Sequence, residues 1–92
     1  CVIPADNYEH ALEIANDSDF GLSAGICTTA LKTAMHFKHN AQAGMVMVNL
    51  PTAGVDYHVP FGGTKASSYG PKEQGAQAME FFTRSKTAYT AY

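Results

Sequence analysis

The run Met45–Val48 (MVMV) is apolar at every position, and it constrains the fold more than any other feature of this chain. An alternating pattern would indicate a strand with one face in water, whereas an unbroken apolar run is typical of a strand buried on both faces. Strands of that kind occur mostly in parallel sheets that are covered by helices. The sequence therefore predicts an α/β fold with a parallel sheet.

The residues before this run complete a strand–helix–strand unit. Residues 22–27 are short and apolar, as expected of a second buried strand. Thr28 or Thr29 can cap the helix that follows, and Gly44 is a typical stop signal after it. The apolar side of this helix consists of Ala30, Ala34, Phe37 and Ala41. A strand, a helix and a strand within roughly 30 residues predict a right-handed parallel βαβ unit.

Further elements are predicted on either side of this unit. Asp6 and Glu9 have the capping-box spacing that begins a helix. Pro71 fits the first turn of a later helix, and residues 78–82 supply the apolar side of that helix. Residues 85–92 read as a strand with no partner next to it in the sequence. An unpaired edge of this kind usually pairs with another chain or domain.

Length and charge narrow the class of protein. The chain has 92 residues, enough for one small domain, and its formal net charge is −2. Because no basic excess is present to neutralise phosphates, we expect no nucleic-acid partner. The apolar runs are far shorter than the ~20 residues that cross a bilayer, so we expect no membrane span. The chain begins at Cys1 without a Met, so we expect a piece whose N-terminal context has been removed.

The cysteines and histidines give no metal-ligand pattern. Cys1 and Cys27 match neither a zinc pair nor a redox pair, and we interpret both as reduced thiols of a cytoplasmic protein. Cys27 lies in an apolar run and is expected to be buried and inert. His36 and His39 lie one helical turn apart, with no carboxylate or thiolate at ligand spacing. We therefore expect no metal site.

The periodicity stops between residues 49 and 69, in a long segment punctuated by Gly and Pro. Long irregular segments in compact domains are usually functional, and α/β proteins hold ligands at the carboxyl ends of their strands. Residues 56–63 (DYHVPFGG) are therefore a candidate binding loop. A packed turn with Phe61 as a core plug is an equal alternative. Residues 62–65 lack the spacing of a phosphate-binding loop, so spacing alone yields no complete catalytic site.

Five blocks, taken together, resemble the C-terminal segment of the NAD(P)-dependent aldehyde dehydrogenase superfamily. They occur in that family's order and spacing and cover nearly the whole chain. The blocks are residues 16–26 (NDSDFGLSAGI), 44–49 (GMVMVN), 60–65 (PFGGTK), 72–75 (KEQG) and 86–87 (KT). Residues 51–60 (PTAGVDYHVP) are similar to the subgroup that oxidises α-ketoglutaric semialdehyde (2,5-dioxopentanoate).

The resemblance implies that this chain and the rest of its own subunit contribute different parts of the enzyme. It implies that residues 1–84 form the C-terminal part of a catalytic domain and that residues 85–92 form an oligomerisation strand of a homo-oligomer. The family's nucleophilic cysteine, its general-base glutamate and its dinucleotide-binding fold lie upstream, and neither Cys1 nor Cys27 matches the nucleophile's motif. By itself the chain is therefore expected to hold no catalytic residue, with NAD or NADP bound mainly by other parts.

The same resemblance implies three substrate-binding residues for a small aldehyde. Phe61 resembles the aromatic residue that lines the substrate tunnel, and Val55 and His58 lie in the preceding loop, which shapes aldehyde specificity in the family. Lys72 stands where many relatives have Arg, so it keeps the charge without the planar fork. The alternative from another class is a non-catalytic interaction module that pairs through its C-terminal strand.

Overall fold

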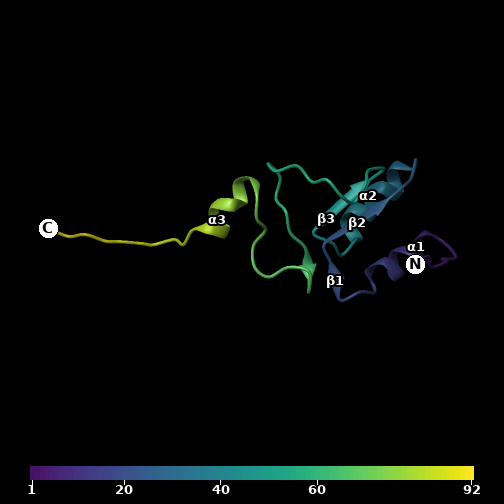
Figure 1. Ribbon diagram of the computed structural model, residues 1–92, viewed down its shortest axis with the longest axis horizontal. Helices are drawn as coiled ribbons and strands as arrows, with labels where there is room; N and C mark the ends of the chain where they lie inside the picture. The colour runs from purple at the N-terminus through teal and green to yellow at the C-terminus, as the bar shows by residue number, and fades with distance from the viewer.

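The computed structural model describes residues 1–92 as an elongated molecule with extents of 70 × 24 × 23 Å. Figure 1 shows the first two helices and the strand pair β2–β3 gathered at one end, and a single extended tail beyond α3 at the other. The elements are α1 (Tyr8–Asn16), β1 (Phe20–Gly21), β2 (Ser23–Ile26), α2 (Leu31–Asn40), β3 (Met45–Val48), β4 (Thr64–Lys65), the 3₁₀ turn η1 (Gly75–Gln77) and α3 (Ala78–Phe82).

The predicted βαβ unit is confirmed. β2 and β3 pair in parallel, with Ser23 opposite Met45 and Ile26 opposite Val48, and α2 is the crossover between them. The buried apolar residues are Ala34 and Phe37 on α2 and Met45 on β3. The other residues of β3 are only half-buried, because two strands and one helix cannot cover both faces of a sheet.

Both long helices begin differently from the sequence prediction. Asn7, not Asp6, caps α1, since its Oδ1 accepts a hydrogen bond from the backbone N of His10 at 2.8 Å. The carboxylate oxygen Oδ2 of Asp6 instead lies 3.3 Å from Nδ1 of His10. In α2 the N-cap is Ala30. The backbone N of Ala30 donates a hydrogen bond to Oγ1 of Thr28 at 3.1 Å, in the turn that precedes the helix. Short polar side chains compete locally for the same backbone donors, so the cap is displaced by a residue or two.

The third helix is shorter than predicted, and Pro71 lies outside it. Glu73 is extended because it pairs with Phe61 in an antiparallel bridge. Gln74 then takes a left-handed φ of 67°, and the chain enters α3 only at Ala78. A tertiary contact therefore replaces the first helical turn that the proline suggested.

The predicted strand at residues 85–92 is not formed within this chain. These residues belong to no helix or strand, they are exposed, and none has a backbone hydrogen-bond partner. Pairing with another chain or domain therefore stays a prediction. None of the helices combines the length and apolar character that crossing a bilayer requires.

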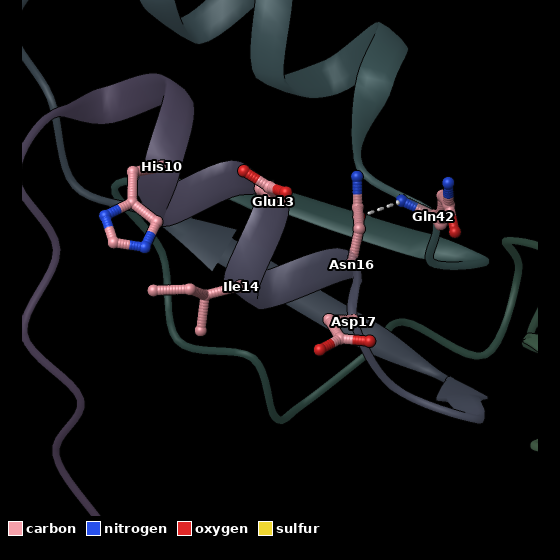
Figure 2. Close-up of a pocket in the computed structure, with 6 residues that line it drawn as sticks. All are labelled: His10, Glu13, Ile14, Asn16, Asp17 and Gln42. Carbon is pink, nitrogen blue, oxygen red and sulfur yellow. Dashed lines mark hydrogen bonds between the residues drawn. The ribbon is translucent and has the colours of Figure 1, made fainter.

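Asn16, the last residue of α1, joins this helix to the end of α2. Its Oδ1 accepts from the backbone N of Gln42 at 2.8 Å, and its Nδ2 donates to the carbonyl of Asn40 at 2.9 Å. Figure 2 shows the Asn16–Gln42 bond beside a wide polar cleft. The cleft is lined by His10, Glu13, Ile14, Asn16, Asp17 and Gln42. Because both ends of one amide are used, this contact fixes the position of α1 relative to the βαβ unit.

Both cysteines are free and exposed. The prediction that Cys27 is buried is wrong for this chain, because Cys27 follows the last residue of β2 and lies where the backbone leaves the sheet.

Candidate functional site

The irregular segment that contains the candidate loop begins at Asn49, directly after β3. Its Oδ1 accepts from the backbone N of Thr28, and its Nδ2 donates to the carbonyl of Thr28, both at 2.8 Å. The amide side chain therefore extends the contact between the two strands by one step. Asn49 itself has a left-handed φ of 56°, and the chain turns there, beyond the carboxyl end of the sheet.

Residues 72–75, called the strap below, hold the far end of this loop. Phe61 and Glu73 exchange two backbone hydrogen bonds, of 2.7 and 2.9 Å. The backbone N of Gly75 donates to the carbonyl of Tyr57 at 3.3 Å. At the other end of the strap, Nζ of Lys72 donates to the carbonyl of Gly44. The strap therefore connects the loop to the beginning of β3.

The Phe61 side chain is half-buried and lines a cavity of about 320 Å³. Its lining combines apolar residues with three residues that carry a hydroxyl group and one acidic residue. The lining residues are Leu22, Phe61, Gly62, Ser67, Ser68, Tyr69, Pro71, Glu73 and Phe81. The Phe61 side chain is therefore partly packed into the fold and also lines a cavity, and the choice between a binding loop and a packed turn stays open.

Val55 and His58 lie in the same loop but do not line the Phe61 cavity. Val55 is half-buried and His58 is exposed. The His58 ring packs edge-to-face on Tyr57, with centroids 5.4 Å apart and an interplanar angle of 78°. The three residues singled out from the sequence are therefore on one segment but do not form a single pocket within this chain, and their role in binding substrate stays a prediction.

Sequence reasoning missed the contacts that fix the Gly-rich stretch. Oγ of Ser67 accepts from the backbone N of Gly21 at 2.9 Å, and Oγ of Ser68 accepts from Gly63 at 2.7 Å. Nζ of Lys65 donates to the carbonyls of Asn16 and Ser18, at 2.6 and 2.8 Å, beyond the end of α1. β4 also pairs with β1, which lies more than 40 residues earlier. Apart from the Ser68–Gly63 bond, which spans five residues, these contacts join segments more than 40 residues apart, so no local pattern predicts them.

The two histidines of α2 are engaged with neighbouring protein groups. The Tyr8 hydroxyl lies 2.8 Å from Nδ1 of His36, and Nδ1 of His39 lies 2.8 Å from the carbonyl of Met35. Desolvation at this contact raises the pKa of the Tyr8 hydroxyl, and the Glu9 carboxylate raises it further. These groups join α1 to α2 and stabilise the end of α2.

The chain is thus an α/β protein whose candidate site lies beyond the carboxyl end of a parallel strand. The model of the Aldehyde dehydrogenase family matches residues 1–88, and the chain belongs to this family. The resemblance noted in the sequence is therefore confirmed.

Several curated relatives are similar along nearly the whole chain. An alpha-ketoglutaric semialdehyde dehydrogenase of Bacillus subtilis is 46% identical over 88 residues, covering 96% of this chain and 18% of the relative. An alpha-ketoglutarate semialdehyde dehydrogenase of Haloferax volcanii is 44% identical over 92 residues, covering 99% of this chain and 19% of the relative. The chain therefore spans less than a fifth of the length of these relatives.

Solved structures agree with this placement. HpcC from Thermus thermophilus superposes with a TM-score of 0.82 at 31% identity, over 98% of this chain and 19% of that one. A putative methylmalonate-semialdehyde dehydrogenase from Sinorhizobium meliloti 1021, complexed with NAD, gives a TM-score of 0.80 at 31% identity, over 94% of this chain and 18% of that one. The fold of the segment is therefore that of aldehyde dehydrogenases.

The polar side chains of residues 62–65 are not free to cradle a phosphate. The stretch 62–65 is the chain's one candidate for a phosphate cradle, and its polar groups already bind protein atoms. Thr64 donates through Oγ1 to the carbonyl of Gln42 at 2.9 Å, and Lys65 is bound to α1 and the turn after it. Ser68 holds the backbone N of Gly63. The Thr64 hydroxyl, the Lys65 ammonium and the backbone N of Gly63 are therefore already bound to protein atoms.

Proposed function

We propose that this chain acts as the C-terminal part of a longer aldehyde dehydrogenase subunit that oxidises an aldehyde to a carboxylic acid with NAD or NADP. The observation that carries the proposal is the similarity along residues 1–88 to the family and to semialdehyde dehydrogenases at 44 and 46% identity. The same similarity supports α-ketoglutaric semialdehyde as the substrate. Residues 1–84 then belong to the catalytic domain.

Within such a subunit this segment supplies a wall of the substrate tunnel. Phe61 presents its ring to the cavity, while its backbone is fixed by the strap. Val55 and His58 belong to the loop that leads to this wall, and we assign them to the entrance of the tunnel. Cys1 and Cys27 do not line the cavity, and the resemblance to the family assigns the nucleophile and the general base to the rest of the subunit. Free thiols also suit a reducing, cytoplasmic compartment.

We expect the full-length protein to form NAD(P)H with α-ketoglutaric semialdehyde at a higher kcat/KM than with propanal or benzaldehyde. The isolated 92-residue chain is expected to show no turnover, since it holds neither nucleophile nor cofactor site. Steady-state kinetics on this panel measure both. No turnover of any aldehyde would contradict the enzyme assignment, whereas a preference for benzaldehyde would contradict only the substrate.

The exposed tail carries a second proposal, that residues 85–92 add a strand to the sheet of a second copy. Its support is the absence of any backbone partner for these residues in this chain, because exposed strand edges pair readily with other chains. A non-catalytic interaction module that pairs through this strand is the alternative function. Intact assembly without turnover of any aldehyde would favour that alternative.

Removing residues 85–92 from the full-length protein is expected to shift its assembly toward smaller species. Thr87→Pro should act in the same direction, because proline cannot donate the backbone hydrogen bond of a paired strand, and Thr87→Ala is the matched control. Light scattering coupled to size-exclusion chromatography gives the mass of each variant. An unchanged mass after truncation would contradict the tail proposal.

A further inference from the structure

The backbone of Gly75 lies unusually close to the candidate loop. Its N–H donates to the carbonyl of Tyr57 at 3.3 Å. A Cβ at this position would lie 2.6 Å from the carbonyl oxygen of His58 and 3.1 Å from its carbon. Both atoms belong to the backbone, so no rotamer change can relieve the contact. Any side chain at residue 75 must therefore displace one of the two segments.

The strap is the more firmly held of the two segments. Two residues before Gly75, Glu73 is paired with Phe61 through two short backbone hydrogen bonds, and η1 begins at Gly75 itself. The loop is held less tightly. Its internal bond from the N of Val59 to the carbonyl of Asp56 is 3.4 Å long, and the side chains of Tyr57 and His58 are exposed. Residues 57–59 are thus the part of the loop that moves, since Phe61 is held by the same two bonds as the strap.

We propose that Gly75 is a positioning residue for the substrate loop: its missing side chain sets how closely residues 57–59 approach the strap, and so where His58 lies relative to Phe61. This inference rests on the proposed function, in which the loop shapes the tunnel entrance. Gly75 does not line the Phe61 cavity. Its replacement should therefore change which aldehydes are accepted more than it changes the chemical step.

The test compares Gly75→Ala with Gly70→Ala in the full-length protein. Both glycines have a left-handed φ, 54° and 80°, so both substitutions carry a backbone cost. A Cβ on Gly70 meets nothing within 4 Å, so this control lacks the contact. Two quantities are measured: amide hydrogen exchange of residues 56–61, and the ratio of kcat/KM for α-ketoglutaric semialdehyde to that for propanal.

Gly75→Ala is expected to accelerate exchange in residues 56–61 and to change the ratio by about 10-fold, while Gly70→Ala changes neither. Equal exchange in the two variants would overturn the positioning role. Faster exchange with an unchanged ratio would leave Gly75 as a positioning residue but overturn the loop's role in discrimination. If Gly75→Ala does not fold, Gly75→Asn retains the Cβ contact at a lower backbone cost.

Discussion

Replacing Phe61 with alanine in the full-length protein is expected to lower kcat/KM for the aldehyde by about 10- to 100-fold, since a single methylene in an apolar pocket is already worth about 10-fold. The Phe61 ring lines the 320 Å³ cavity, whereas its pairing with Glu73 uses only backbone atoms. The substitution therefore removes the ring that lines the cavity and leaves the backbone hydrogen bonds with Glu73 in place. Steady-state kinetics of NAD(P)H formation measure the loss.

Two further variants separate this effect from unfolding. Phe61→Leu keeps an apolar side chain in the cavity and should recover much of the activity. Phe20→Ala makes the same truncation on β1 at a residue that is 65% exposed and does not line the cavity, so it should leave kcat/KM unchanged. Thermal unfolding of each variant shows whether it is folded. A folded Phe61→Ala protein with wild-type kcat/KM would refute the tunnel-wall assignment.

Alanine at Gly44 is expected to cause the largest loss of stability, at least about 3 kcal/mol, at the upper end of the usual cost of overpacking. A Cβ there would lie 2.6 Å from Cα of Gly63 and 2.8 Å from the carbonyl carbon of Gly62. The backbone of Gly44 cannot move away easily, because hydrogen bonds hold it on both sides. The N of Gly44 donates to the carbonyl of Gly21 at 2.9 Å, and its own carbonyl accepts from Lys72. Denaturant unfolding of the full-length protein measures the change.

Gly25→Ala is the matched control on the neighbouring strand. A Cβ there would meet the terminal methyl of Thr52 at 2.9 Å, and this side chain can rotate away. Its effect should therefore be within about 1 kcal/mol of wild type, because alanine also lowers the conformational entropy of the unfolded chain. Equal stability of the Gly44→Ala and Gly25→Ala proteins would show that the Gly62–Gly63 backbone is not the tight contact described here.

Some features of the candidate site could be predicted from the sequence, whereas others depend on how distant segments fold together. The resemblance to the family singled out Phe61, Val55 and His58, which lie in the irregular segment after β3, and their role in binding substrate stays a prediction. The sequence could not show that only Phe61 of the three lines the cavity, or that Gly75 touches the loop. Those facts depend on how residues 72–75 fold back, and the helix signal at Pro71 pointed to a different path.

The sequence by itself determined the elements whose cause is local. The apolar run defined both ends of β3 at Met45–Val48, and the spacing of Ala34 and Phe37 identified the buried side of α2, because burial and helical periodicity act on neighbouring residues. Only the tertiary structure decided the β1–β4 pairing and the bond between the strap and the loop. These contacts join backbone groups separated by 12 to 45 residues, and backbone groups are the same in every residue, so no side-chain pattern encodes their partners.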